Sequence, residues 1–458
     1  MLPEEFTERM KQMLQSEYED FVASYDSEKY QALRLNPLKG QTGEFFAQNP
    51  FTLTPVPWTE YGYYYTKEDR PGKHPYHDAG VYYIQEPSAM APAEYLAAKP
   101  GEYVLDLCAA PGGKSTQIAA QMQGEGILIS NEIHPARAKI LSENMERMGV
   151  KNAIVTNETP EHLSEEFPEY FDRIMVDAPC SGEGMFRKNE DAVSEWSLEN
   201  VAVCAKRQDG ILDCAADMLK AGGRIVYSTC TFAPDENEGT ISRFLKRHPE
   251  FVIEPVQKAD GMSEGRADWT EEPADGLAHT IRLFPHHLHG EGHYLAVLKK
   301  KGNFDPGFRA GARTGYEKGI EPKEYKEFTV FCEETLRNWE SRTIIRFGEQ
   351  LYELPKDAPA LKGLKVLRPG LHLGTFKKNR FEPSHALALA LCPENVYHTV
   401  NLSSQEKTIA DYINGQTFSH DGDKGWYLIT VDGYSIGWGK SAGGTMKNHY
   451  PKGLRHII

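Results

Sequence analysis

The sequence predicts an α/β protein built around a doubly wound, Rossmann-like sheet, with further domains on either side. Two observations carry this prediction. Between residues 100 and 300, short apolar runs alternate with helical segments, which is typical of a parallel sheet covered by helices. Motifs of small and polar residues follow four of these apolar runs, at the points where open α/β sheets place their ligands.

The apolar runs that we expect to form the sheet lie at 103–107, 127–130, 153–155, 174–176, 224–227 and 294–298. Helices are expected at 113–122 and 135–148, and a buried helix face at 211–219. The second helix opens with a proline, which suits the first helical turn. Residues 254–280 look like a polar insertion before the last strand.

Length and composition indicate a multidomain protein. The chain has 458 residues, of which 40% are hydrophobic, enough to bury several cores. We expect four domains: 1–95 (α+β), 96–302 (the sheet described above), 303–385 and 386–458, with a charged, glycine-containing linker at 299–323. The first domain opens with a helix that carries Phe6, Met10 and Met13 on one face, and a later tyrosine cluster reads as a half-buried strand.

Several protein classes are disfavoured. No run of about 18 apolar residues is present, so we expect no membrane span. The opening segment MLPEEFTERMKQML lacks the apolar stretch of a secretory signal. Seven cysteines is an odd number for a disulfide framework, which favours reduced thiols and a cytoplasmic location.

Charge is distributed unevenly. The net charge of −15 argues against a broadly basic, nucleic-acid-binding protein. Yet residues 361–381 and 437–458 contain six and four lysines or arginines and no acid. We expect a segregated basic face built from these two stretches, with a merely solvated surface as the alternative.

The first motif reads VLDLCAAPGGKST over residues 104–116, where the first strand turns into a helix. Small residues there let the backbone approach a ligand, and the helix N-terminus offers free N–H groups. A P-loop would need glycine where this sequence has Cys108, and the dinucleotide pattern G-x-G-x-x-G is absent. The second motif, Asn131-Glu132, ends the second strand, where an acid binds ribose hydroxyls. Together they indicate an adenosine-containing cofactor, for which S-adenosylmethionine fits best.

The third and fourth motifs each contain a cysteine. Asp177-Ala178-Pro179-Cys180-Ser181-Gly182 follows the fourth strand, and Tyr227-Ser228-Thr229-Cys230-Thr231 follows the fifth. The ends of neighbouring parallel strands meet at one edge of the sheet, so the two thiols belong to one site. A zinc site would need further ligands at CxxC-type spacing, and inert buried thiols are the remaining alternative.

These four motifs resemble the NOL/NOP/Sun group of RNA cytosine-5 methyltransferases. The likeness extends to LRLNP at 33–37, QEPSAM at 85–90 and the segment 285–294. The tail, with GWYL at 425–428 and IGWGK at 436–440, looks like the PUA-like end of the F-type enzymes of bacterial 16S rRNA. The resemblance implies a class I S-adenosylmethionine-dependent methyltransferase core, an RNA-binding N-terminal domain and C-terminal PUA-like domains.

The resemblance also implies roles for residues. A thiolate that adds to cytosine C6 makes C5 nucleophilic enough to take a methyl group. The residues leave open which cysteine attacks, whereas the resemblance assigns Cys230 as the nucleophile and Cys180 to product release. Asp177 would hold the N3 and amino edge of a flipped base. Cofactor contacts would come from Cys108, Ala109, Ala110, Pro111, Gly112, Gly113, Lys114, Glu132, Arg137 and Asp177.

One position departs from the family pattern. The family often carries an aspartate near the adenine, after the third strand, where this chain reads Thr156-Asn157-Glu158-Thr159. Asn157 or Thr159 would make this contact instead. His286, His287, His289 and His293 look like metal ligands, but no matching cysteine or carboxylate set accompanies them in the sequence. We therefore expect no metal site and a histidine loop packed near the active site.

The expected activity is methylation of cytosine C5 in 16S rRNA or the small ribosomal subunit, by a monomer that does not bind membranes. Three alternatives remain. The same chemistry could act on tRNA, because only the flanking domains choose the substrate. A non-catalytic assembly factor could keep the fold, although Cys180, Cys230 and Asp177 argue against it. An ATP-dependent enzyme could use Gly113-Lys114-Ser115.

Overall fold

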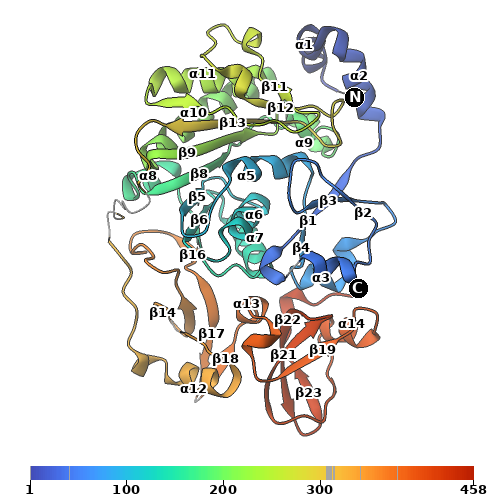
Figure 1. The fold of residues 1–458 in the computed structure, drawn as a ribbon, viewed down its shortest axis with the longest axis vertical. Coiled ribbons are helices and arrows are strands. Elements are labelled where there is room, and N and C mark those ends of the chain that lie inside the picture. The colour runs from blue at the N-terminus through green and yellow to red at the C-terminus, as the bar shows by residue number, and fades with distance from the viewer. Residues whose placement is uncertain are drawn as a thin grey trace.

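The centre of the chain folds as the α/β sheet that the sequence predicts (Figure 1). The computed structural model describes residues 2–40, 42–305, 312, 315–340, 342–378 and 380–457, so part of the expected linker lies outside the described residues. Five parallel strands lie side by side in the order β9, β8, β5, β6 and β7. They are β5 (Tyr103–Asp106), β6 (Ile127–Asn131), β7 (Ala153–Thr156), β8 (Phe171–Asp177) and β9 (Leu219–Thr229).

Antiparallel strands extend the sheet beyond β9. β13 (His293–Lys300) pairs with β9, β12 (Ile281–Leu283) pairs with β13, and β11 (Ser263–Glu264) forms the edge. The polar insertion expected at 254–280 thus supplies an edge strand. β10 (Phe251–Ile253) also pairs with β13.

Helices cover both faces of the sheet, and because successive strand residues point to opposite sides, each strand contributes to two cores. Leu105 and Ile174 pack into one core with Leu212 of the covering helix α10 (Leu198–Met218). Val104 packs into the other core with Leu141 of α7 (Pro135–Arg147). The further covering helices are α5 (Ala91–Leu96), α6 (Gly113–Met122), α8 (Pro160–Glu166) and α11 (Glu238–Arg247). α10 ends one residue before Leu219, which begins β9 instead of completing the helix face that we expected.

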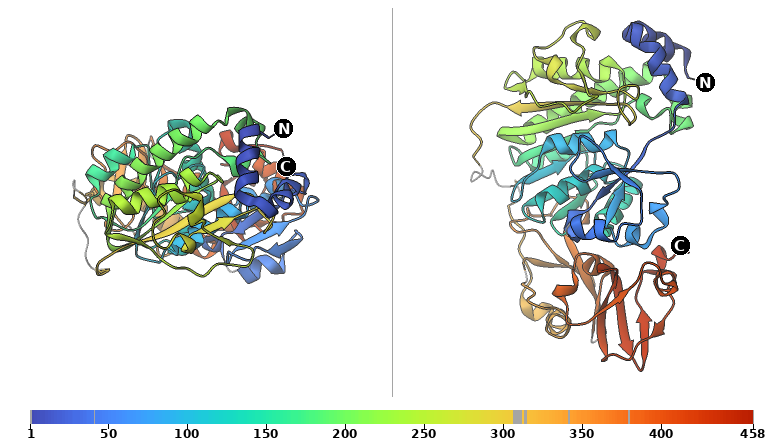
Figure 2. Two further views of the ribbon diagram at one scale, coloured as in Figure 1. Left: turned by 90° about the horizontal axis from the view of Figure 1, so that it is seen from above. Right: turned by 45° about the vertical axis from the view of Figure 1, so that its right-hand side comes forward.

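The N-terminal residues form two separate bodies. α1 (Glu4–Leu14), the short helix η1 (Gln15–Glu17) and α2 (Tyr18–Asp26) lie at one end of the molecule (Figure 2). Phe6, Met10 and Leu14 are buried there against Phe186 and Trp196 of the central domain, while Met13 is only partly buried. The chain then forms an antiparallel sheet in the order β2, β3, β1, β4: β1 (Gln31–Leu35), β2 (Leu53–Pro55), β3 (Gly62–Tyr65) and β4 (Tyr82–Ile84).

Strand β1 is joined to the central domain by Arg34, which is only 2% exposed. Its guanidinium donates to Gln85 Oε1 at 2.9 Å, to the Gly113 carbonyl at 3.0 Å and to Thr116 Oγ1 at 2.8 Å. Asn36 donates to the carbonyls of Gly80 and Met148, at 2.8 and 2.9 Å. Through these buried hydrogen bonds, the LRLNP motif connects the N-terminal sheet to the start of α6 and the end of α7.

The C-terminal third contains two further sheets. The first, in the order β14, β15, β17, β18, has α12 (Lys326–Thr335) and α13 (His385–Leu389) beside it. The second, in the order β19, β21, β22, β23, β20, packs on the N-terminal sheet through Tyr82 and Ile429, and Tyr76 donates to Asp432 at 2.9 Å. Chain ends that are distant in sequence thus share one core. The strands are β14 (Ile344–Phe347), β15 (Gln350–Glu353), β17 (Leu371–Lys377), β18 (Arg380–Pro383), β19 (Thr399–Leu402), β20 (Phe418–Ser419), β21 (Gly425–Val431), β22 (Tyr434–Ala442) and β23 (Thr445–Asn448); α14 (Lys407–Ile413) follows β19.

The expectation that residues 361–381 form one basic surface is wrong at Arg368. β16 (Val366–Arg368) leaves the C-terminal sheets and extends the central sheet, antiparallel to β7. Arg368 is 3% exposed, donates to the Val150 carbonyl at 3.0 Å and lies 3.6 Å from Glu146. The exposed side chains of Lys362, Lys365 and Lys377 remain available for a basic face.

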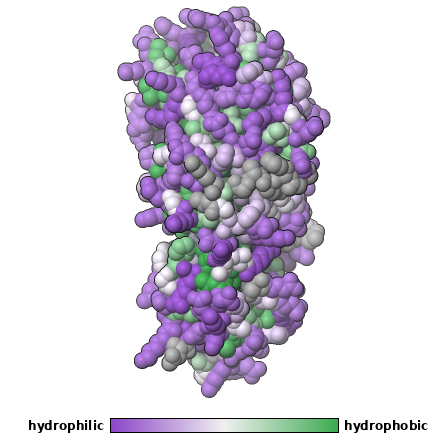
Figure 3. Space-filling model, turned by 90° about the vertical axis from the view of Figure 1, so that its left-hand side faces the viewer, coloured by the Kyte–Doolittle hydropathy of each residue, from purple (hydrophilic) through white to green (hydrophobic). Residues whose placement is uncertain are grey.

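The outer surface is mainly hydrophilic in the view of Figure 3, where hydrophobic residues gather at the level of the C-terminal domains. Among the described residues, no helix has both the length and the apolar composition needed to cross a membrane.

Replacement of Arg34 by methionine tests how much its buried hydrogen bonds contribute to stability. The change leaves Gln85, Gly113 and Thr116 without their buried donor, so the free energy of unfolding should fall by about 2–5 kcal/mol. Thermal unfolding of the full chain measures this loss. Arg70→Met removes an exposed arginine of the same N-terminal domain and should leave the unfolding temperature unchanged. Equal unfolding temperatures for both variants would contradict the role of Arg34.

Candidate active site

All four sequence motifs meet at the carboxyl edge of the parallel strands. The strand order reverses at β5, which lies between β8 and β6, and such reversal points open a crevice in doubly wound sheets. A pocket of about 900 Å³ lies at this edge. Seven of the predicted site residues line it: Cys108, Ala110, Glu132, Arg137, Asp177, Cys180 and Cys230.

One side of the pocket is formed by Glu132 and Arg137. Glu132 is 3% exposed, accepts a hydrogen bond from the His134 N–H at 2.9 Å, and lies 3.4 Å from the Arg137 guanidinium. Arg137 also donates to the Ala110 carbonyl at 2.8 Å. The loops that follow β5 and β6 are thereby joined, and a carboxylate is held at the position where doubly wound sheets bind ribose.

Asn157 and Thr159 do not line this pocket. The Asn157 amide donates to the carbonyls of Glu132 and Ile133, at 2.7 and 2.8 Å, so it holds the loop that carries Glu132. Thr159 caps α8 by accepting a hydrogen bond from the His162 N–H at 3.2 Å. The pocket wall near these two residues is formed by Pro160 and Glu161 instead.

The loop after β5 is shaped for close packing. Gly112 has φ +116°, and a Cβ there would lie 3.2 Å from Leu141, so any other residue would be strained. Ala109, Pro111, Gly112, Gly113 and Lys114 lie behind the pocket and do not line it. Ser115 donates to Asp106 at 2.6 Å, and burial raises the Asp106 pKa to about 7. A P-loop would direct Lys114 and Ser115 at phosphate and magnesium, so this arrangement does not favour the ATP-dependent alternative.

Asp177, which lines the pocket, forms an ion pair with Lys114, with 2.8 Å between Nζ and Oδ2. The other carboxylate oxygen of Asp177 accepts a hydrogen bond from Ser228 at 2.6 Å. Burial raises the pKa of Asp177, but the Lys114 ammonium and the nearby His293 outweigh burial and hold that pKa below its ordinary value. Asp177 is therefore an oriented, ionised acceptor at neutral pH.

The two cysteines of the third and fourth motifs lie together. The Sγ atoms of Cys180 and Cys230 are 3.3 Å apart, and the Cys230 N–H donates to Cys180 Sγ at 3.3 Å. Parallel pairing of β8 with β9 places Asp177 opposite Ser228, which brings the following loops into contact. The hydrogen bond with Cys230 raises the pKa of Cys180 well above its ordinary value, and burial raises it further. Cys180 is therefore a protonated thiol at neutral pH.

A hydrogen-bonded network links the loop that carries Cys180 to the loop that carries Cys230. Ser181 Oγ lies 2.9 Å from Thr231 Oγ1, and the Ser181 hydroxyl and N–H both donate to Glu236. Gln208 of α10 donates to Glu236 at 2.9 Å and to the Pro179 carbonyl at 3.1 Å. Burial raises the pKa of Glu236 to about 7.

Four family models match consecutive parts of the chain. The N-terminal domain of 16S rRNA methyltransferase RsmF matches residues 2–87, and 16S rRNA methyltransferase RsmB/F matches residues 93–299. The RsmF rRNA methyltransferase first C-terminal domain matches residues 330–391, and the methyltransferase RsmF PUA domain matches residues 399–456.

Curated relatives match over nearly the whole length. The ribosomal RNA small subunit methyltransferase F of Erwinia tasmaniensis is 31% identical over 475 residues, spanning 99% of this chain and 96% of that protein. The protein of the same description from Klebsiella pneumoniae is 31% identical over 468 residues, again with 99% and 96% coverage. The chain belongs to the 16S rRNA methyltransferase RsmB/F family.

Solved structures of similar fold agree with this family assignment. A methyltransferase homolog protein from Pyrococcus horikoshii is similar with a TM-score of 0.57 and 27% identity, covering 64% of this chain and 94% of that one. NSun6 from the same organism, crystallised with SFG, shares the fold with a TM-score of 0.54 and 20% identity, over 66% and 99% of the two chains. The chain is thus an rRNA methyltransferase with a Rossmann-like core and a C-terminal PUA domain.

Sequence reasoning missed one wall of the site in this RsmB/F-family chain. Helix α10 lines the pocket along the face that carries Val203, Lys206, Arg207, Gly210 and Ile211. These positions recur at three- and four-residue spacing, which is the helical signal that would have found them. Gln208 and Glu236 were also missed, because their role depends on contacts between loops that are distant in sequence.

The four histidines of the predicted loop separate in the structure. His293 begins β13 close to the site, where burial and the Lys114 charge together lower its pKa to about 4. His289 stacks on Tyr30, with 4.1 Å between ring centroids. His286 and His287 lie beside Glu17 of the N-terminal helices, so the structure supplies the carboxylate that the sequence did not place with them.

Glu236→Gln gives a pH-dependent test of the cysteine loops. The raised pKa means that the folded chain keeps a proton on Glu236 that the unfolded chain loses between pH 4.5 and about 7. The contribution of Glu236 to stability therefore declines as pH rises through this window, by up to roughly 3 kcal/mol, whereas glutamine cannot titrate. The difference in unfolding temperature between wild type and Glu236→Gln should shift accordingly. Exposed Glu8→Gln is the control, and a pH-independent difference for Glu236→Gln would contradict the assignment.

Proposed function

We propose that this RsmB/F-family chain transfers a methyl group from S-adenosylmethionine to C5 of cytosine in 16S rRNA, through a covalent bond between Cys230 and cytosine C6. The observation that carries the proposal is the pair of thiols, 3.3 Å apart, that line one pocket. Asp177 and Glu132 line the same pocket.

The donor set of the pocket fits S-adenosylmethionine. The pocket volume of about 900 Å³ is within the range of small-molecule sites. Buried Glu132 offers a carboxylate to ribose hydroxyls. The loop from Cys108 to Lys114, of which Cys108 and Ala110 line the pocket, would hold the methionine part at the start of α6. SFG, the molecule crystallised with archaeal NSun6, is an analogue of this cofactor. When bound, the cofactor supplies an electrophilic methyl group on its sulfonium sulfur.

Cytosine C5 is a poor nucleophile, and addition of a thiolate at C6 makes it more nucleophilic. The Cys230 thiolate forms a C–S bond at C6, and the electrons of the C5–C6 double bond become available at C5. C5 takes the methyl group as the carbon–sulfur bond of the sulfonium breaks toward sulfur. Cys180 carries the raised pKa and stays protonated, so it can donate its S–H to a thiolate on Cys230. The assignment of Cys230 as the nucleophile follows the family resemblance, and a protonated Cys180 beside it fits that role.

Release of the product requires removal of the C5 proton and cleavage of the Cys230–C6 bond. The proton goes to a base, the C–S electrons return to Cys230, and the C5–C6 double bond is restored. Cys180 is placed to assist this step, since its sulfur lies 3.3 Å from the sulfur that must leave. Loss of Cys180 should therefore block release more than attachment.

Asp177 is proposed to hold the target base. The carboxylate is ionised and held by Lys114 and Ser228, so it can accept a hydrogen bond from the cytosine amino group. The proposed site thus has two parts. Glu132 and the loop before α6 bind the cofactor, while Asp177 and the cysteines act on the base.

The substrate proposal rests on the flanking domains. Relatives that match nearly the full chain are named small subunit methyltransferases, and the RsmF N-terminal and PUA models match both ends. We propose that the domains bounded at 1–95, 303–385 and 386–458 bind 16S rRNA around the methyltransferase domain at 96–302. The proposal keeps the cytoplasmic location and the monomeric state that the sequence predicts.

Methyl transfer from labelled S-adenosylmethionine tests the function directly. Small subunits, 16S rRNA and tRNA are each offered, and the modified nucleoside is identified after digestion. We expect 5-methylcytosine in the 16S samples. Cys230→Ala should lower the rate at least about a thousandfold, and Cys180→Ala should accumulate a covalent RNA–protein complex.

Other outcomes separate the alternatives. Label in tRNA alone would contradict the substrate while keeping the mechanism. A different methylated nucleoside would contradict the C5 chemistry. Cofactor binding without any transfer to the three substrates would favour the non-catalytic assembly factor. Cys204→Ala, a buried thiol on α10 outside the pocket, is the control and should keep full activity.

Glu132→Gln tests the cofactor assignment. A charge-assisted hydrogen bond to ribose is replaced by a neutral one, so the dissociation constant for S-adenosylmethionine should rise about tenfold. Isothermal titration calorimetry on the full chain measures this change. Glu161→Gln alters an exposed carboxylate on the same pocket wall and serves as the control. Unchanged affinity in Glu132→Gln would contradict the role of Glu132.

A further inference from the structure

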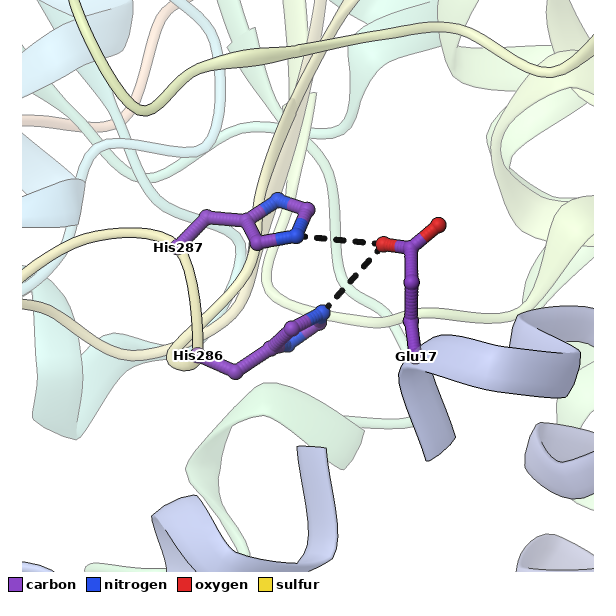
Figure 4. A group of neighbouring side chains, drawn as sticks. All are labelled: Glu17, His286 and His287. Carbon is purple, nitrogen blue, oxygen red and sulfur yellow. Dashed lines mark hydrogen bonds and ion pairs between the residues drawn. The ribbon is translucent and has the colours of Figure 1, made fainter. Parts of the chain in front are cut away.

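Glu17, His286 and His287 form a cluster outside the pocket (Figure 4). Glu17 ends η1, between the two N-terminal helices, and the histidines lie in the turn between β12 and β13. Both imidazole rings point their Nε2 atoms at the carboxylate of Glu17 (Figure 4). Two imidazoles and a carboxylate are a donor set that zinc and similar divalent ions prefer.

The spacing of the donor atoms fits one metal ion. Glu17 Oε2 lies 3.1 Å from His287 Nε2 and 3.5 Å from His286 Nε2, and the three ligand atoms lie within 4.8 Å of one another. Ligands at about 2.0–2.1 Å from a tetrahedral zinc ion lie about 3.3 Å from each other. The separation from His286 is long for a hydrogen bond, whereas it suits two ligands that share an ion.

Two outer contacts orient the ligands. His287 Nδ1 lies 2.9 Å from Ser263 Oγ, and the other oxygen of Glu17 lies 3.1 Å from the Arg266 guanidinium. Metal-binding histidines usually have their second ring nitrogen hydrogen-bonded in this way, which leaves the Nε2 lone pair free for the ion. Carboxylate ligands are held by outer partners in the same manner.

His286 points to a ligand independently. Its side chain is 3% exposed and packs edge-on against Phe21, with 5.7 Å between ring centroids. Its Nδ1 has no hydrogen-bond partner among the described residues, so the long contact with Glu17 is the hydrogen bond that remains to the ring. Nε2 therefore has only this 3.5 Å contact, and an ion bound at Nε2 would replace a weak hydrogen bond with a metal–ligand bond.

We propose that Glu17, His286 and His287 bind a divalent transition-metal ion, with zinc as the occupant and water in the fourth position. The ion would join residues that are 269 apart in the chain and fix the N-terminal helices to the central domain. Glu17 and His287 are about one-third exposed, which leaves a path for entry. Because the Arg266 charge offsets that of Glu17, affinity is lower than in a closed structural zinc site.

Metal titration of the full chain tests the proposal. The chain is stripped with chelator and titrated with Zn²⁺ and with Co²⁺, whose visible absorption reports tetrahedral ligands. The Cys180→Ser/Cys230→Ser double variant is titrated in parallel to remove the other cluster of soft ligands. Thermal unfolding with and without Zn²⁺ gives a second readout, because an ion bound only to the folded state raises the unfolding temperature.

We expect one equivalent to bind in wild type and in the double cysteine variant, without cobalt–thiolate absorption. Glu17→Gln and His287→Ala should weaken binding at least about tenfold and abolish the thermal shift, whereas His289→Ala, in the same loop, should keep both. Absence of binding in wild type, or unchanged binding in Glu17→Gln and His287→Ala, would overturn the proposal. Metal binding and thermal unfolding are measured without methyl transfer, so failure of the proposed methyltransferase function would not affect the result.

Discussion

The half-buried ion pair between Lys114 and Asp177 is the contact on which the rest of the site depends. Partial burial by itself raises the pKa of this carboxylate, because it penalises the charged form. The ammonium group from α6 prevents this and fixes one oxygen, while Ser228 fixes the other. Buried ion pairs add little net stability, since desolvation offsets their attraction. The contribution of this pair is the orientation of a charged group between the cofactor loop and the two cysteine loops.

The neighbouring networks follow from the same constraint. Cys180 lies three residues after Asp177, and Cys230 lies two residues after Ser228, so the pairing of β8 with β9 brings both thiols to one point. Glu236 then ties Ser181 to the loop of Thr231. On the opposite side, Arg34 of the N-terminal sheet holds the start of α6, where Lys114 resides. The N-terminal domain therefore supports the site directly, in addition to any contact that it makes with RNA.

The sequence predicted the central sheet because strands buried on both faces have an unambiguous apolar pattern, and it predicted the pocket loops because small residues and acids follow those strands. Contacts between distant segments were beyond its reach. No local pattern shows that Arg368 is buried against β7, or that Glu17 lies beside His286 and His287. Asn157 or Thr159 was predicted to contact the adenine. The Asn157 amide donates to two backbone carbonyls of the loop after β6, a contact that no local sequence pattern shows.

The central claim is that Cys230, and not Cys180, carries the cytosine. RNA containing 5-fluorocytosine has no C5 proton to lose, so a covalent complex should persist after methyl transfer. Trypsin places the two thiols in different peptides, residues 174–187 for Cys180 and 225–243 for Cys230. Mass spectrometry of the trapped wild-type complex should find the nucleotide on the 225–243 peptide. A nucleotide on the 174–187 peptide would contradict the account.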